Sequence, residues 1–192
     1  MNGLNNDLIR SAEPTSPGVP RVHVVGRKNA GKTTLVCELV RELTRLGCKV
    51  ATVKHTHHHH ELDTPGKDSH RHRESGAAGV GILSPQMTAA FVPVTRDQDE
   101  HLRYEPFDVI FGHCDLILVE GDLHTSAKKI EVWRSVVSEA PYAAEDDGIA
   151  AVVTDDDTTV PCPLWSRSDV PALAKQLLQL AGTDGPFLRN GG

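Results

Sequence analysis

Residues 26–34 read Gly-Arg-Lys-Asn-Ala-Gly-Lys-Thr-Thr, and they carry the strongest signal in the sequence for both fold and function. It follows the apolar run Val-His-Val-Val at 22–25 and precedes a helical pattern. The two glycines let the backbone wrap closely enough for successive N–H groups to point at phosphate oxygens, while Lys32 reaches the terminal phosphates and Thr33 offers a hydroxyl to Mg²⁺. The helix that follows directs the positive end of its dipole at the same anion. The stretch, here called the phosphate loop, therefore predicts a nucleotide site, against the alternative of a plain glycine turn.

The composition is typical of a soluble globular protein with one domain, since 39% of the 192 residues are apolar and 24% are charged. The formal net charge of −6 argues against a general nucleic-acid-binding protein, whose surface would be basic. The four cysteines form no CxxC pair, and the sequence lacks both a secretory signal and a run of roughly 20 apolar residues. We therefore expect a cytoplasmic protein with reduced thiols and no membrane or nucleic-acid partner.

Strand-like and helical stretches alternate along the chain. Apolar residues at helical spacing follow Lys32, and Gly47 is placed to end that helix before a strand at 50–53. The run Asp115 to Val119 is continuously apolar, as in a strand covered on both faces by helices. This alternation predicts an α/β fold of the P-loop NTPase type, with a mainly parallel sheet flanked by helices in a single domain. Further strands are expected at 80–83, 89–94, 130–133 and 149–153, further helices at 69–78 and 169–180, and a mixed helical stretch at 97–112.

The nucleotide-binding domain is expected to span residues 21–181. Residues 1–20 carry Asn, Ser, Pro and Gly with little apolar periodicity, and residues 182–192 end in glycines. We predict a flexible N-terminal segment and a flexible C-terminal tail.

Side chains just after the strands are the first candidates for a site, because ligands of open parallel sheets bind beyond the carboxyl ends of the strands. The strand that ends at Val119 is followed by Glu120, which places a carboxylate at this edge. Mg²⁺ uses one or two carboxylates together with substrate phosphates, so Thr33, Glu120 and a third oxygen would suffice. The alternative is that Glu120 only ends an exposed strand.

Six of the 11 histidines lie between His55 and His70. Neutral imidazole suits zinc, nickel and copper, but four adjacent histidines cannot all point at one ion and no cysteine lies nearby. A transition-metal site and a solvated polar loop therefore both stay open. Asp63 and Asp68 lie further along the same loop, and we interpret them as switch-like residues that meet Mg²⁺ or its waters, or as parts of the same solvated loop.

Three blocks of this sequence together resemble the MobB family, the molybdopterin-guanine dinucleotide biosynthesis adaptors. The first is the phosphate loop, which many proteins share. The second joins Val-Lys-His-Thr-His-His at 53–58 to Asp-Thr-Pro-Gly-Lys-Asp-Ser at 63–69, and it is specific. The third joins Asp-Leu-Ile-Leu-Val-Glu-Gly at 115–121 to Lys-Ile-Glu-Val at 129–132. The resemblance covers about residues 21 to 155.

The resemblance implies a GTP-binding protein that acts mainly as an accessory protein, with at most a weak, Mg²⁺-dependent GTPase activity. It implies that the chain is a homodimer and assists the nucleotidyltransferase MobA in joining GMP to molybdopterin. Lys32 and Glu120 would carry the catalysis, and Thr33, Glu120 and Asp63 would serve the metal. The residues implied to bind the nucleotide are Gly26, Arg27, Lys28, Asn29, Ala30, Gly31, Lys32, Thr33, Thr34, His55, His57, Asp63, Lys67 and Asp68.

Guanine specificity rests on the resemblance, because no Asn-Lys-x-Asp signature occurs in the chain. Asp155 follows the expected strand at 149–153 and is the best-placed carboxylate to accept from guanine N1–H and N2–H₂. Asp156, Asp157 or a plain turn are alternatives. The chain also departs from the family, because Asp122-Leu123 stands where an aromatic and a basic residue usually follow Glu-Gly, and the histidine block is longer.

Two other functions stay open at this stage. One is an ATP-dependent phosphotransferase or ligase resembling dethiobiotin synthetase, which also places a Glu-Gly pair after a strand. The other is a metallochaperone GTPase like those that serve nickel enzymes, motivated by the histidines at 55–60. Nucleotide preference and bound metal distinguish the three functions.

Overall fold

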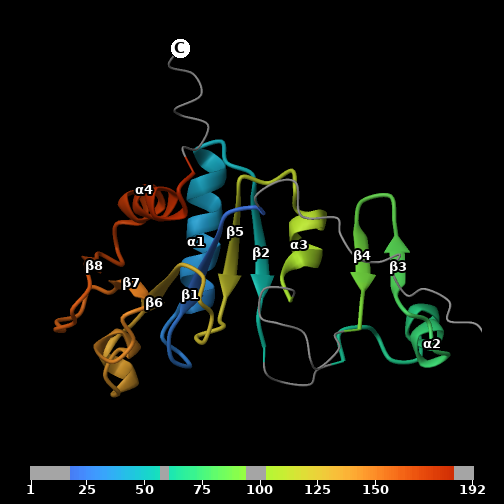
Figure 1. Cartoon of the computed structure of the whole chain (residues 1–192), viewed down its shortest axis with the longest axis horizontal. Coiled ribbons are helices and arrows are strands. Elements are labelled where there is room, and N and C mark those ends of the chain that lie inside the picture. The colour runs from blue at the N-terminus through green and yellow to red at the C-terminus, as the bar shows by residue number, and fades with distance from the viewer. Residues whose placement is uncertain (1–17, 57–60, 94–102, 184–192) are drawn as a thin grey trace, which may run out of the picture.

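The centre of the molecule is a six-stranded sheet in which every neighbouring pair of strands is parallel (Figure 1). The computed structural model describes residues 18–56, 61–93 and 103–183. The strand order is β2-β5-β1-β6-β7-β8, so the carboxyl ends of all six strands lie along one edge. This confirms the predicted α/β fold. The bounds are β1 (Arg21–Val25), β2 (Val50–Lys54), β5 (Leu116–Glu120), β6 (Lys129–Val132), β7 (Ile149–Val153) and β8 (Leu164–Trp165).

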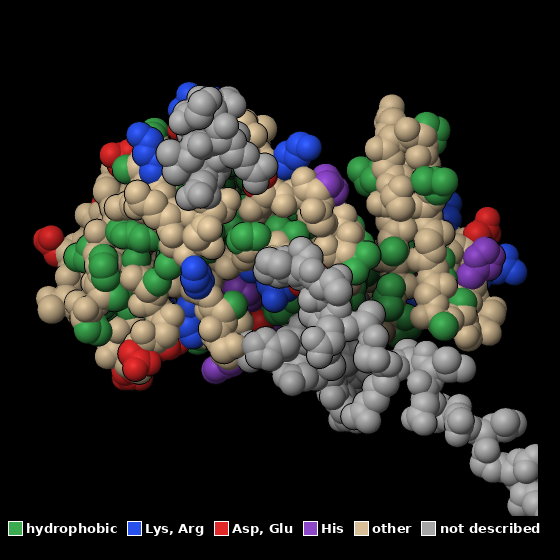
Figure 2. All heavy atoms as spheres, turned by 45° about the horizontal axis from the view of Figure 1, so that its top comes forward, with side chains coloured by type: hydrophobic (Ala, Val, Ile, Leu, Met, Phe, Trp, Pro, Cys, Tyr) green, Lys and Arg blue, Asp and Glu red, His purple; other side chains and the backbone are tan. Residues whose placement is uncertain are grey.

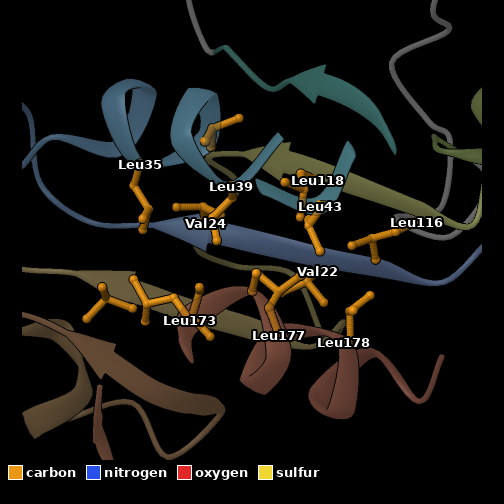
Figure 3. Close-up of a cluster of buried hydrophobic side chains, with 14 of the residues drawn as sticks. Val22, Val24, Leu35, Leu39, Leu43, Leu116, Leu118, Leu173, Leu177 and Leu178 are labelled. Atoms are coloured by element: carbon orange, nitrogen blue, oxygen red, sulfur yellow. The ribbon is translucent and has the colours of Figure 1, made fainter. Parts of the chain in front are cut away.

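Two long helices cover one face of the sheet, α1 (Lys32–Arg45) and α4 (Val170–Ala181). Leucines on one face of each helix form a single buried cluster with alternate residues of β1 and β5, as Figure 3 shows. Asp169 caps the start of α4, where its carboxylate accepts from the Ala172 N–H, and Gly182 caps the end of the helix in a left-handed conformation. The labelled core residues are Val22, Val24, Leu35, Leu39, Leu43, Leu116, Leu118, Leu173, Leu177 and Leu178.

The opposite face is covered by shorter elements. Tyr104 and the short helix α3 (Glu105–Ile110) pack against Ile117 and Val119 of β5. Two 3₁₀ turns, η1 (Ser135–Val137) and η2 (Tyr142–Ala144), follow β6 and lie over the other half of the sheet. In the described part of the chain no helix is long and apolar enough to cross a membrane.

A small unit stands apart from the main sheet in Figure 1. It consists of α2 (Asp68–Glu74) and the antiparallel hairpin formed by β3 (Val80–Leu83) and β4 (Thr88–Phe91). The predicted helix at 69–78 was too long, because Gly76 adopts a φ of 94° and ends the helical conformation after Glu74.

Other predicted boundaries differ in instructive ways. Of the mixed stretch at 97–112, only Glu105–Ile110 is helical in the described part, and Pro106 sits in its first turn, where the missing N–H costs nothing. Residues 97–102 lie outside the described residues, as do residue 94 of the expected strand 89–94, the terminal segment 1–17 and the tail 184–192. The short strand β8 was not predicted, since two residues carry no periodicity.

Candidate functional site

The phosphate loop connects β1 to α1 at the carboxyl edge of the sheet. Gly26 adopts a φ of 140°, and a Cβ at this position would lie 2.3 Å from the Val132 carbonyl oxygen of β6. Only glycine therefore allows the loop to start so close to the neighbouring strand. Gly31, with a φ of 98°, precedes the first residue of α1 and turns the chain into the helix. The first N–H groups of an α-helix have no partner within the helix, so the start of a helix in this position stabilises an anion.

Lys32 lies folded over the phosphate loop. Its Nζ donates to the carbonyl oxygens of Gly26 at 2.8 Å and Arg27 at 2.7 Å. Burial lowers the pKa of this ammonium, while the nearby carboxylate of Glu120 raises it. Two of its three N–H groups are thus held by the described residues, which fixes the ammonium beside the loop and leaves one donor for a phosphate oxygen.

Thr33 and Glu120, two of the three residues predicted to hold Mg²⁺, lie in direct contact. The Thr33 hydroxyl donates to Glu120 Oε1 at 2.8 Å, and Lys54 Nζ lies 3.7 Å from the same oxygen. A hydroxyl and a carboxylate are hard oxygen donors of the kind that Mg²⁺ prefers, and the pair stands at the first turn of α1, where a nucleotide phosphate would complete the ligand set. The residues present therefore fit a magnesium nucleotide.

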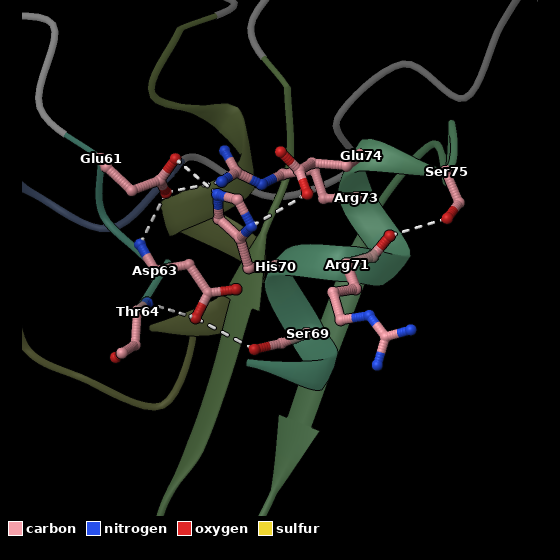
Figure 4. A network of polar contacts seen from close by, with 9 residues as sticks. All are labelled: Glu61, Asp63, Thr64, Ser69, His70, Arg71, Arg73, Glu74 and Ser75. Atoms are coloured by element: carbon pink, nitrogen blue, oxygen red, sulfur yellow. Dashed lines mark hydrogen bonds and ion pairs between the residues drawn. The ribbon is translucent and has the colours of Figure 1, made fainter. Parts of the chain in front are cut away.

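Asp63 belongs to a separate network that Figure 4 shows around the start of α2. Its Oδ1 accepts from the Thr64 N–H at 2.7 Å and from the Ser69 hydroxyl at 3.0 Å. Glu61 accepts from Arg73 and from the Asp63 N–H, and the hydrogen bond from Arg73 lowers the pKa of Glu61 to about 2. Between the described residues there is no contact that joins Asp63 to Thr33 or Glu120, so the structure assembles two of the three predicted metal ligands.

Lys67 and Asp68 lie on the same small unit as Asp63. Lys67 precedes α2, and Asp68 stands in its first turn, where a carboxylate favours the helix dipole. Both side chains are exposed. Within the described ranges no contact links either residue to the phosphate loop, and their roles at the nucleotide stay predictions.

His55 follows β2, and its N–H donates to the Glu120 carbonyl at 2.9 Å while its Nε2 lies 3.4 Å from Arg103 Nη1. His57 and the rest of the histidine block, 58–60, lie outside the described residues. Within the described ranges no three His, Cys, Asp or Glu side chains converge on a possible metal ion. The transition-metal hypothesis therefore gains no support from this part of the chain.

Asp155 lies in a cavity of about 320 Å³ beside the phosphate loop. Its Oδ1 accepts from the Ser166 hydroxyl at 2.8 Å and from the Ser168 N–H at 3.1 Å. The hydrogen bond from Ser166 is the main reason that the pKa of Asp155 lies below its usual value, so the carboxylate stays ionised at neutral pH. The other lining residues are Ala30, Gly31, Thr34, Arg134, Asp156 and Arg167.

The sequence reasoning missed the two arginines of this cavity. Arg134 comes shortly after β6, so the rule that sites lie beyond strand ends would have found it. Arg167 follows β8, which the sequence did not predict, and it pairs with Glu38 of α1 at 2.6 Å.

A buried polar layer supports the turn after β5. The Tyr104 hydroxyl donates to Asp122 Oδ2 at 2.7 Å, and His23 Nδ1 lies 3.3 Å from the Gly121 carbonyl. Asp122 adopts a left-handed φ of 64° and is nearly inaccessible to solvent. Asp122, which departs from the family pattern, thus helps to fix the backbone that carries Glu120.

Comparison with known proteins places these features in a family. The chain matches a family model described as MobB, Molybdopterin guanine dinucleotide synthesis protein B, over residues 21–155. It is 31% identical over 157 residues to the molybdopterin-guanine dinucleotide biosynthesis adapter protein of Escherichia coli (strain K12), covering 81% of this chain and 90% of that protein. The protein of the same name from Haemophilus influenzae is 28% identical over 156 residues, covering 81% of this chain and 86% of that protein.

Solved structures agree with this match. The crystal structure of molybdopterin-guanine biosynthesis protein B aligns with a TM-score of 0.62 at 27% identity, covering 84% of this chain and 99% of that one. The structure of Bacillus subtilis MobB aligns with a TM-score of 0.60 at 19% identity, covering 84% of this chain and 97% of that one. This second alignment supports the assignment of the fold. The resemblance seen in the sequence is confirmed, and the chain belongs to the MobB family.

Proposed function

We propose that this chain is a GTP-binding adapter in molybdopterin guanine dinucleotide biosynthesis. Its relatives from Escherichia coli and Haemophilus influenzae are named as adapter proteins of that biosynthesis. The observation that carries the proposal is the 2.8 Å contact between Thr33 and Glu120 at the first turn of α1. It provides a hydroxyl and a carboxylate beside a loop built for phosphates, as a magnesium nucleotide requires.

The guanine base is proposed to bind in the cavity of Asp155. Guanine presents two neighbouring donors, N1–H and N2–H₂, and an ionised carboxylate can accept both. Ser166 and Ser168 donate to Oδ1 of Asp155, and Oδ2 is proposed to accept from the base. Adenine lacks this donor pair, and GTP is therefore the preferred nucleotide.

Hydrolysis of GTP is proposed to be slow. Glu120 accepts from Thr33 and lies close to Lys54, an arrangement that suits a metal ligand better than a base that removes a proton from water. The protein would act mainly as an accessory to a MobA-type nucleotidyltransferase in the cytoplasm, with molybdopterin as the second small molecule.

A homodimer is proposed from the hairpin β3–β4. Figure 2 shows hydrophobic side chains along this hairpin, which has only two strands. Leu83 is 85% exposed and Met87 is 73% exposed, with Ile82 and Val92 beside them. An isolated two-stranded hairpin is marginally stable in water, and a second copy of the chain would cover this apolar surface.

The test is reconstitution of GMP transfer to molybdopterin by a MobA-type nucleotidyltransferase, with and without this protein. Wild-type protein with GTP and Mg²⁺ is expected to raise the yield, and Lys32→Ala is expected to fail while it stays folded. Stimulation that is the same for Lys32→Ala and wild type, or that ATP supports equally, would overturn the proposal.

A further inference from the structure

A second cavity, of about 410 Å³, lies beside the phosphate loop and shares no lining residue with the cavity of Asp155. One wall is formed by side chains of the loop itself, Arg27, Lys28 and Asn29, and the other by Val136, Val137 and Tyr142 of the segment between β6 and β7. Nucleotide phosphates are bound by the backbone N–H groups of such a loop and by Lys32. The side chains of residues 27–29 are therefore available to a different ligand.

Arg27 is fixed in position at this cavity. Its guanidinium stacks over the Tyr142 ring, 4.4 Å from the centroid. Its Nε and Nη2 donate to the Ala140 carbonyl oxygen at 3.3 Å and 3.2 Å. The remaining N–H groups of the guanidinium keep their hydrogen-bonding capacity for an anion, and little side-chain entropy is left to lose on binding.

The wall that carries Tyr142 is anchored by a buried carboxylate. Glu131 of β6 is fully inaccessible to solvent and accepts from the Tyr142 and Ala143 N–H groups at 2.9 Å each. The indole N–H of Trp133 donates to the Glu139 carbonyl at 2.8 Å, which ties down the other end of the same segment. The cavity is thus preformed rather than built by its ligand.

The lining residues define the chemistry of the ligand. Arg27 and Lys28 outweigh the single carboxylate of Glu139, so the cavity favours an anion. Arg27 suits the planar, bidentate geometry of a phosphate, while Val136, Val137 and Tyr142 offer apolar and aromatic surface to a ring. The volume lies in the range of small-molecule sites.

We propose that this cavity binds a second ligand, a phosphate monoester that carries a planar heterocycle, at the same time as the nucleotide. The inference rests on the proposed function, because it requires a nucleotide in the phosphate loop. A phosphorylated pterin belongs to this class, so the cavity would hold the pterin next to the GTP in the phosphate loop. The loop then contributes its backbone to one ligand and its side chains to the other.

The probe for this proposal is neopterin 3′-phosphate, whose fluorescence anisotropy reports binding. It is titrated into protein saturated with Mg²⁺ and the non-hydrolysable GTP analogue guanosine 5′-(β,γ-imido)triphosphate. Saturable binding of the probe is expected. Neopterin without the phosphate should bind at least about 10-fold more weakly, because it cannot make the charge-assisted hydrogen bonds of the phosphate. Excess nucleotide should not displace the probe.

Three variants locate the binding. Val136→Asp places a carboxylate at the rim, where the side chain is 71% exposed, and should weaken the probe about 10-fold or more. Tyr142→Ala should also weaken the probe and leave binding of the GTP analogue unchanged. Val109→Asp, on an 84% exposed residue of α3 that does not line the cavity, is the matched control and should bind the probe like wild type.

The proposal would be overturned by an absence of saturable binding to the nucleotide-loaded protein, by displacement of the probe with excess nucleotide, or by equal affinity in Val136→Asp and wild type. Loss of nucleotidyltransferase association in Val136→Asp with unchanged probe binding would assign the cavity to protein docking instead. Binding of the GTP analogue is measured separately. Its failure refutes the proposed function, whereas good nucleotide binding without probe binding refutes only this inference.

Discussion

His23 shows at the scale of one residue how the site is supported from beneath. It lies fully buried in the central strand β1, and burial lowers its pKa despite the nearby carboxylate of Asp122. Tyr104, Arg21 and His55 are the other polar or charged neighbours. Because the unfolded state takes up the proton more readily, His23 supports stability above about pH 6.5, the ordinary pKa of histidine, and this support is lost as the pH falls towards the lower pKa of the folded state.

We therefore predict that the free energy of unfolding falls as the pH is lowered in wild type, and that it falls less in His23→Phe. Chemical denaturation at pH 7.5 and pH 5.5 measures it, and wild type should lose up to about 1.4 kcal/mol per pH unit below pH 6.5 from this group. His72→Phe, at an exposed position on α2, is the control and should keep the wild-type dependence. Equal pH dependence in His23→Phe and wild type would show that His23 does not titrate on unfolding.

We propose that Asp155 determines the preference for guanine over adenine. Asp155→Asn replaces one acceptor oxygen with a donor that faces the guanine N–H groups, so GTP should bind about 10- to 100-fold more weakly while ATP is little affected. Competition between GTP and ATP for the same protein measures the ratio. A preference for GTP that survives Asp155→Asn would move base recognition to another residue.

Gly26 connects two elements, because the phosphate loop and β6 approach each other at this residue. Gly26→Ala brings a methyl group 2.3 Å from the Val132 carbonyl at a φ that L-residues avoid, so the loop must move away from the strand. We expect Gly26→Ala to lower the free energy of unfolding by about 3 kcal/mol and also to abolish nucleotide binding. Gly76→Ala shares a positive φ but meets nothing within 4 Å, and it should cost only about 1 kcal/mol. Similar losses in both variants would contradict the role of the close approach.

The elements show what the sequence could and could not predict. The leucine spacing of α1 and the continuous apolar run of β5 were predictable, because a helix buried along one face and a strand buried on both faces each leave a local pattern in the sequence. Thr33 was a candidate because of the phosphate-loop motif, and Glu120 because it follows an expected strand, since parallel strands end at one edge. Contacts between distant segments, such as Tyr104 with Asp122, leave no local periodicity and were not predictable. The position of α2 and the hairpin β3–β4 apart from the main sheet was not predictable either, because local spacing says nothing about how distant segments are arranged (Figure 1).

In the described part of the chain, the cavity of Asp155 and the cavity of Arg27 lie beside the phosphate loop, and the apolar hairpin β3–β4 stands apart from the main sheet (Figure 1). If the hairpin is a dimer contact, Leu83→Asp should shift the protein from dimer to monomer without changing the stability of the sheet, because Leu83 is 85% exposed. Sedimentation velocity at micromolar concentration measures this shift. Leu164→Asp, on β8 at one edge of the main sheet, is the control and should stay dimeric. A monomeric wild-type protein, or a Leu83→Asp variant that stays dimeric, would remove the hairpin from the dimer.

We propose that the phosphate loop binds GTP in preference to ATP. The decisive experiment is calorimetric titration of GTP and ATP with Mg²⁺, on wild type and Lys32→Ala. We expect a clear preference for GTP in wild type and at least about 100-fold weaker GTP binding in Lys32→Ala, since the Lys32 ammonium is held beside the loop by two carbonyl groups and offers its remaining donor to phosphate. A preference for ATP, or equal GTP affinity in Lys32→Ala and wild type, would contradict it.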